Sequence, residues 1–412
     1  MSTGVAGSAA LDEAVSNLVF DPVTRANPYP VYDLLRSEQP VYRSPIGPLF
    51  VTSYDDCAHL LRDPRLTRRF EDSWEQRAIF QNSVGRAWFE EQSRWMLWLD
   101  PPDHTRLRGL VSKAFTPRYV AKLHDQVAAI VARLIDDLRG AGEVDFISAF
   151  AFELPITVIC DMLGVPTDDR ADFRQWTIAL AQTLEPLPPD DVQDAADEAA
   201  IKIGAFFHDL IAQRRNQPGD DLLHALIAAE EEGHRLSEDE IVSTAALLLG
   251  AGFETTTNLL GNGMLALLRH PDQWQALIDE PAGLAPAAVE ELLRYDSPVQ
   301  MATPRVANES MEVAGTAIDP GDVVVTIVAG GNRDPQRFDN PNVVNLRRPD
   351  PDPLSFGGGP HFCLGASLAR LEGAVAFESL AIALPHMTLA DDDPQWRRAL
   401  NLRGLESLRV SV

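Results

Sequence analysis

Apolar residues recur at three- and four-residue spacing through most of the chain, and this pattern predicts a mainly helical protein. Periodic segments lie near residues 105–115, 117–139, 147–163, 171–184, 191–216, 221–231, 272–279 and 285–295. A longer helix is expected from Ser237 to His270, because Ser237 and Glu240 fit a capping box and Pro271 ends the pattern. At 1.5 Å per residue it would be roughly 50 Å long, enough to cross a large domain.

A smaller β region is predicted at both ends of the chain. Residues 41–42 and 49–52 flank a Pro-Ile-Gly-Pro turn, and strands are expected at 311–313, 316–318 and 323–328, before a last helix at 364–384. The fold class is therefore mainly α with a small β region, without the strand–helix alternation of a doubly wound fold. Residues 1–18 are weakly patterned and are expected to be mobile. Residues 19–412 are expected to form a single domain.

Composition narrows the function classes. The chain carries 61 Asp and Glu against 35 Lys and Arg, a formal net charge of −26, so nucleic acid and anionic membrane surfaces should repel it. Its longest apolar run, about 245–253, is far short of the roughly 20 residues that cross a bilayer. Cys57, Cys160 and Cys363 form no Cys-x-x-Cys pair, which argues against a zinc site or a disulfide framework. The N-terminus lacks the features of a signal peptide, so we expect a cytoplasmic protein, as a monomer.

The strongest chemical signal is the segment 356–365, FGGGPHFCLG, in which Cys363 stands at the start of the last helix. Free backbone N–H groups and the positive end of that helix favour a thiolate there, and a thiolate is a metal ligand or a nucleophile. A flat cofactor lying against the loop would explain the missing side chains at Gly357, Gly359 and Gly365. The alternatives are an inert buried cysteine beside a turn, or a phosphate loop, which lacks its Lys-Ser/Thr here.

This segment resembles the haem-binding loop of cytochrome P450, Phe-Gly-x-Gly-x-His-x-Cys-x-Gly, at all six fixed positions. The resemblance implies the cytochrome P450 fold, with haem b (iron-protoporphyrin IX) between the long central helix and the helix after the cysteine. It implies Cys363 as the axial iron ligand, whose sulfur donates electron density that helps O–O cleavage. It also implies haem contacts at Phe356, Gly357, His361 and Gly365.

Residues 250–257, GAGFETTT, break a local rule, since glycine and threonine are poor helix formers in the middle of a helix. Ala251, Glu254, Thr255 and Asn258 are expected on one face, where a carboxylate beside a hydroxyl can relay protons. Close helix packing, with the threonines bonded back to carbonyls, is the alternative. The stretch is similar to the P450 oxygen-binding motif, which implies that Glu254 and Thr255 deliver protons and that Ala251 lies against the haem.

Further positions fit the same resemblance. Glu291 and Arg294 can pair across one helical turn, and the resemblance adds Arg348 to them in a structural role, although Glu-x-x-Arg alone is a common surface pattern. Haem carries two propionates that require cations. The resemblance assigns that task to four basic residues, His104, Arg108, Arg305 and His361.

The sequence predicts an external electron donor, because the chain has no room for a flavin or iron–sulfur domain. Residues 104–122 hold Arg106, Arg108, Lys113, Arg118 and Lys122 and no acid, which favours docking of a small acidic protein. Neutralisation of the propionates is the alternative for this cluster. Ferredoxin, with an NAD(P)H-dependent ferredoxin reductase, is the expected partner, and O₂ and a small molecule are the expected substrates.

These residues together predict a P450 monooxygenase. Three alternatives remain: a haem-thiolate enzyme of another reaction type, which can lack Glu254 and Thr255, a non-catalytic haem sensor, and a cysteine hydrolase using Cys363 with His361. Aromatic residues between 74 and 98 favour an apolar substrate, but core packing explains them equally well. The Pro-rich break at 185–189 is either an ordinary loop or a mobile lid.

Overall fold

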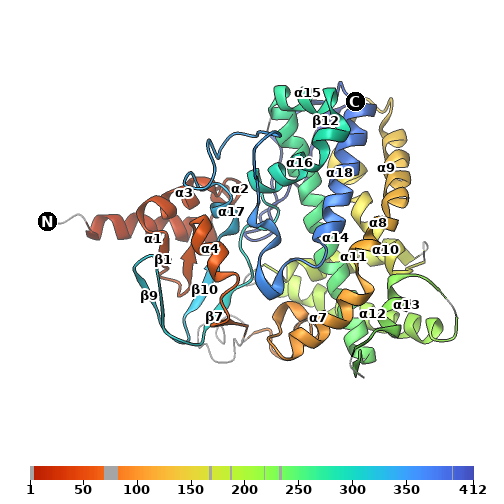
Figure 1. The fold of residues 1–412 in the computed structure, drawn as a ribbon, viewed down its shortest axis with the longest axis horizontal. Coiled ribbons are helices and arrows are strands. Elements are labelled where there is room, and N and C mark those ends of the chain that lie inside the picture. The colour runs from red at the N-terminus through yellow and green to blue at the C-terminus, as the bar shows by residue number, and fades with distance from the viewer. Residues whose placement is uncertain are drawn as a thin grey trace.

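The computed structural model describes residues 4–68, 82–166, 169–185, 188–217, 219–231, 234–391 and 393–412. Trp74 and Phe80, among the predicted pocket aromatics, and Pro186 and Leu187 of the Pro-rich break lie outside these residues. Within them, most helices gather on one side, and the main sheet lies on the other side together with the N-terminal helices (Figure 1). The predicted class, mainly α with a small β region, is confirmed.

The N-terminal segment differs from the expectation of a mobile tail. Residues Gly4–Phe20 form helix α1, and its Leu11, Val15 and Leu18 are buried against Tyr32 and neighbouring apolar residues. These three leucine and valine positions are four and three residues apart, so they share one helical face. Small residues surround this short apolar stripe, so helical periodicity is weak in the sequence of this segment. Helices α2 (Pro22–Ala26) and α3 (Tyr29–Glu38) follow.

The main sheet has five strands in the order β1-β2-β10-β7-β3. These are β1 (Val41–Arg43), β2 (Leu49–Val51), β10 (Val323–Thr326), β7 (Arg305–Ala307) and β3 (Leu66–Thr67). The predicted hairpin of β1 and β2 is confirmed, and β2 also pairs with β10 in parallel. Strands β8 (Met311–Val313) and β9 (Thr316–Ile318) form a second predicted hairpin, while a sheet of β4 (Glu143–Asp145), β12 (Arg409–Ser411) and β11 (Thr388–Leu389) was not predicted.

Helix α14 (Glu238–Arg269) crosses the helical part, as predicted. Ser237 caps it, and the reciprocal Ser237–Glu240 capping box is present. Helix α14 packs against α10, α12, α16 and α18. The remaining helices are α4 (Tyr54–Leu60), α6 (Ala87–Gln92), α7 (Asp103–Ala114), α8 (Pro117–Lys122), α9 (His124–Leu138), α10 (Glu153–Leu163), α11 (Arg170–Gln182), α12 (Asp190–Arg214), α13 (Leu222–Ala228), α15 (Pro271–Asp279), α16 (Pro281–Tyr295), α17 (Val328–Gly331) and α18 (Ala366–Ala383).

Two predicted helices are divided. The segment 117–139 is α8 and α9 with Leu123 between them, and 147–163 is a π-helical turn, Ile147–Ala151, followed by α10. Neither break has a glycine or proline that would have indicated it in the sequence. Among the described helices, none is both long enough and apolar enough to cross a membrane.

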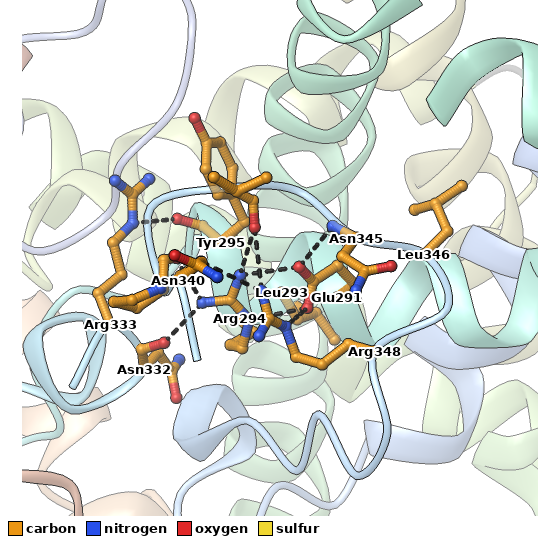
Figure 2. A network of polar contacts seen from close by, with 12 residues as sticks. Glu291, Leu293, Arg294, Tyr295, Asn332, Arg333, Asn340, Asn345, Leu346 and Arg348 are labelled. Atoms are coloured by element: carbon orange, nitrogen blue, oxygen red, sulfur yellow. Dashed lines mark hydrogen bonds and ion pairs between the residues drawn. The ribbon is translucent and has the colours of Figure 1, made fainter. Parts of the chain in front are cut away.

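The predicted pairing of Glu291, Arg294 and Arg348 is confirmed (Figure 2). Glu291 Oε2 accepts from Arg294 Nε at 2.7 Å and from Arg348 Nε at 2.9 Å. The Oε1 atom accepts from Arg294 Nη2 and from the Asn345 N–H, both at 2.8 Å. Arg294 also donates to backbone carbonyls, including that of Pro341. The network ties α16 to the irregular segment that leads into the cysteine loop.

Candidate active site

The cysteine loop is shaped by its own backbone and by a neighbouring segment. The Cys363 N–H donates to the Phe356 carbonyl at 2.9 Å, which closes the loop. Gly357 and Gly359 have φ of +71° and +66°, the left-handed region that favours glycine. A Cβ on Gly359 would lie 2.7 Å from the Leu61 carbonyl oxygen. Packing of the chain therefore accounts for these two glycines, where the sequence suggested an adjacent cofactor.

Cys363 is accessible although protein surrounds it. The side chain is exposed, yet burial raises the pKa of its thiol more strongly than any other influence lowers it. The N–H groups of Gly365 and Ala366 and the positive charge of Arg108 act in the opposite direction. The helix N-terminus thus favours the thiolate, as predicted, but the protein alone does not ionise the sulfur. Coordination to a metal deprotonates such a thiol.

The four predicted propionate contacts come together from three parts of the chain. The rings of His104, on α7, and His361, in the cysteine loop, lie with centroids 4.1 Å apart. Arg108 Nη2 donates to the Phe362 carbonyl at 2.8 Å, which ties α7 to the loop. Arg305, on β7, is buried and completes the group.

A fifth basic residue, Arg68, was missed. It is buried, and its Nη1 donates to the carbonyls of Thr303 and Pro304, at 2.9 and 3.1 Å, just before Arg305. Burial and the neighbouring Arg305 lower its pKa to about 9. A single arginine that follows a two-residue strand has no periodic signature. Only the pairing of β3 with β7 brings it to this place.

These basic groups lack the partners that burial normally demands. Among the described residues, neither ring nitrogen of His104 has a hydrogen-bond partner, and the Nε atoms of Arg68 and Arg305 also have none. Burial and the four neighbouring basic groups lower the pKa of His361 to about 2. Buried unpartnered donors beside mutually repelling cations require an anionic group. The two carboxylates of a haem, with Cys363 as its axial ligand, fit this donor set.

Helix α14 supplies an accessible face at its middle. Most of its central residues are buried, but Leu248, Ala251 and Thr255 are partly accessible and Gly252 is exposed. These four residues are three and four apart and so share one face. A Cβ on Gly252 would meet no atom within 4 Å, so this face adjoins open space. Small residues therefore leave room for a small ligand here.

Ala251, Glu254, Thr255 and Asn258 lie at helical spacing on one face of α14, but their exposure differs: Ala251 and Thr255 are partly accessible, whereas Glu254 and Asn258 are buried. Glu254 is buried and Oε1 accepts from Arg397 Nη1 at 2.8 Å. Burial raises the pKa of its carboxyl, while Arg397 opposes the rise. The Thr255 hydroxyl donates to the Ala251 carbonyl at 3.0 Å. Among the described residues no hydrogen bond joins Glu254 to Thr255, so the two are sequence neighbours that face different surroundings.

The basic segment 104–122 is less basic in the fold than in the sequence. Arg106 pairs with Glu240 of α14, and Arg108 is directed to the cysteine loop. Arg118 and Lys122, on α8, are exposed. Helix α8 packs against α18, the helix that follows Cys363.

An accessible cysteine at a helix N-terminus and buried basic side chains with unpartnered nitrogens are the features of a haem-thiolate protein. The family model for cytochrome P450 matches residues 71–381. PksS of Bacillus subtilis (strain 168), a polyketide biosynthesis cytochrome P450, is 41% identical over 395 residues, 94% of this chain and 96% of PksS. Vitamin D(3) 25-hydroxylase of Pseudonocardia autotrophica is 40% identical over 394 residues, 94% of each chain.

Solved structures agree. P450BioI, in complex with an acyl carrier protein ligated to hexadec-9Z-enoic acid, has a TM-score of 0.87 at 38% identity and covers 95% of this chain and 99% of that chain. The chain belongs to the cytochrome P450 family. It is a P450 monooxygenase that binds haem b and acts on a small organic substrate with electrons from redox partners.

Proposed function

We propose that Cys363 is the axial thiolate ligand of the haem iron and that Glu254 and Thr255 deliver protons for oxygen activation. The observation that carries this proposal is the accessible face of α14, formed by Leu248, Ala251, Gly252 and Thr255. The middle of α14 is otherwise buried, and its packing does not account for four accessible positions there. Such a face suits a small ligand.

The remaining haem contacts follow from charge and position. His104, Arg108, Arg305 and His361 bind the propionates, since their unpartnered or repelling charges need carboxylates. We add Arg68 to this group on the same grounds. Phe356, Gly357 and Gly365 would contact the haem from the cysteine loop, and Ala251 would contact it from α14.

The bound haem supplies the iron at which O₂ is reduced, so that one oxygen atom enters the substrate and the other leaves as water. The protein's part is to hold and move protons. Burial raises the pKa of the Glu254 carboxyl, which suits this group to take up and release a proton. The Thr255 hydroxyl, on the accessible face, is suited to donate to a ligand there after it leaves the Ala251 carbonyl. A haem sensor needs neither group.

The substrate is proposed to be a small, apolar molecule that binds free. The names of the relatives point to a polyketide pathway, to vitamin D(3) and to a fatty acyl group on a carrier protein, so similarity does not choose among them. Of the aromatic residues between 74 and 98, Trp88 and Trp95 are fully buried, which favours core packing for these two. Asp190 and Asp191 are exposed at the start of α12 and would repel an acidic carrier protein.

The electron donor is proposed to be a ferredoxin, reduced by an NAD(P)H-dependent ferredoxin reductase. Exposed Arg118 and Lys122 beside α18 would attract an acidic protein toward the cysteine side. The chain is proposed to act as a cytoplasmic monomer, consistent with its free cysteines. Its net charge of −26 argues against nucleic acid and membranes as partners.

The first test is the reduced, CO-bound difference spectrum of the purified protein and of Cys363→Ser. A strongly red-shifted Soret band in the wild-type protein, and its loss in the variant, are expected for a thiolate ligand. Cys160→Ser is the matched control, because Cys160 is buried in the core and should leave the band unchanged. An identical red-shifted band in Cys363→Ser would exclude Cys363 as the ligand.

A further inference from the structure

The C-terminal hairpin, residues 396–405, contacts α14 near Glu254 and Asn262. It is closed by a bridge between Trp396 and Leu405 and by a hydrogen bond from the Arg397 N–H to the Gly404 carbonyl at 3.0 Å. Asn262 of α14 donates to the Arg403 carbonyl at 3.0 Å. Arg397 of the hairpin forms an ion pair with Glu254 of α14. A hydrogen bond from Asn262 and an ion pair to Glu254 therefore join the hairpin to the helix, and Gly404 of the hairpin lies close to Asn258.

The ion pair is partly shielded from water. Arg397 Nη1 lies 2.8 Å from Glu254 Oε1, and the exposed fractions of the two side chains are 29% and 11%. A carboxylate so placed keeps its charge-assisted hydrogen bond only while it is ionised. Protonation of Glu254 removes the attraction to Arg397. Release from Arg397 and gain of a proton are therefore linked.

A second carboxylate, that of Glu185, binds the backbone of the same hairpin. Glu185, in the segment between α11 and α12, accepts hydrogen bonds from the N–H groups of Leu400 at 2.7 Å, Asn401 at 2.9 Å and Leu402 at 2.8 Å. Burial raises the pKa of Glu185, and these N–H groups oppose the rise. Because every partner of its oxygens is a donor, the contacts favour the ionised form.

The two carboxylates and the one arginine act on each other. Among the charged groups of the described residues, Arg397 and Glu185 are the two that affect Glu254: the arginine lowers its pKa and the second carboxylate raises it. Glu254 itself stands on a helix packed by α10, α12 and α16. Arg397 is part of the hairpin, and the backbone N–H groups of the hairpin hold Glu185 in place.

We propose that Arg397 is a positioning residue for proton delivery: it holds the Glu254 carboxylate toward the C-terminal hairpin, while Glu185 acts against it, so that the pair sets how readily Glu254 holds a proton. This inference rests on the proton-delivering role proposed for Glu254. In each delivery the O–H bond of Glu254 breaks, its proton passes to the acceptor, and the carboxylate left behind pairs with Arg397. A proton from solvent water then restores the acid and releases it from Arg397.

The proposal predicts shifts of opposite sign in two variants. The titration of Glu254 is followed by pH-difference infrared spectra of the ferric holoenzyme in the carbonyl region of protonated carboxylic acids, and is assigned by subtracting Glu254→Gln. In Arg397→Gln the midpoint should rise by about one pH unit or more, and in Glu185→Gln it should fall. Arg397→Lys should restore most of the wild-type value.

Arg398→Gln is the matched control, because Arg398 is exposed and adjacent in sequence to Arg397. It should leave the Glu254 midpoint unchanged. If Arg397 serves only to hold the hairpin, Arg397→Gln lowers stability and leaves the midpoint where it is, and the inference is wrong. Equal shifts in the same direction for Arg397→Gln and Glu185→Gln would also overturn it.

A second measurement separates the role of Arg397 from the proton-delivering role of Glu254. The pH profile of the fraction of NAD(P)H electrons lost as peroxide is measured in the same variants. If the infrared midpoints shift as predicted but Glu254→Gln loses no more electrons to peroxide than wild type, the electrostatic inference holds and Glu254 is not the proton donor. If Glu254→Gln loses electrons but the midpoints do not move, Glu254 keeps its role and Arg397 does not set it.

Discussion

Removing the charge of the buried Glu291 should strongly destabilise the protein. Glu291 is 1% exposed and its two oxygens accept four hydrogen bonds, two from Arg294, one from Arg348 and one from the Asn345 N–H. Glu291→Gln keeps the shape but leaves two guanidinium groups, one fully buried, without a counter-ion. Breaking a buried ion pair in this way costs about 3–5 kcal/mol.

The control for this experiment is the adjacent residue. Glu290 pairs with Arg370 across part-exposed surface, so Glu290→Gln should cost only about 0–1 kcal/mol. Both variants are compared with wild type by urea denaturation followed by circular dichroism, with the haem absorbance as a second probe. The expected difference raises the unfolded fraction by roughly a hundredfold or more at equal conditions. Equal denaturation midpoints for Glu291→Gln and Glu290→Gln would show that the network contributes no more than a surface pair.

Three further predictions test other parts of the structure. Thr255→Ala should divert electrons from product to peroxide at little cost in stability, since its hydroxyl bonds only to its own helix, and peroxide formed per NAD(P)H consumed measures this. Reversing charge in Arg118→Glu with Lys122→Glu should slow reduction by ferredoxin and flatten its dependence on salt in stopped-flow traces. Burial raises the pKa of Glu372 to about 8, so the free energy of unfolding should fall by about 1.4 kcal/mol per pH unit as pH rises from about 4.5 toward 8. Denaturation of Glu372→Gln at several pH values should lack this slope. An unchanged slope would show that the carboxyl is in contact with solvent.

Local signals in the sequence predicted what local interactions determine. The capping box at Ser237 and the proline at 271 are contacts within one turn, and they gave the two ends of α14 to within a residue. The fixed spacing of the cysteine loop likewise placed Cys363 just before α18. Each of these features depends on residues that are close in the chain, so spacing carries the information.

Contacts between distant segments were not predictable in the same way. Arg68 joins the basic group through the pairing of β3 with β7, and Arg106 loses its free charge to Glu240, more than a hundred residues away. Arg397 meets Glu254 only because the last hairpin docks on α14. Arginines are frequent and long, so no spacing marks the one that will be buried. These three arginines change the electrostatics of the site, and the sequence motifs do not indicate their contribution.

The composition of α14 is a weaker argument for function than its accessibility. Thr255, Thr256 and Thr257 all donate to the carbonyl four residues earlier, so the helix accommodates them without a ligand. A Cβ on Gly250 would lie 3.4 Å from the Trp95 ring, so packing also favours glycine there. Helix packing thus explains most of the broken rule. Gly252, exposed and with open space beside it, and Glu254, an acid buried with one arginine, are not explained by packing, and the chemistry of this helix rests on these two positions.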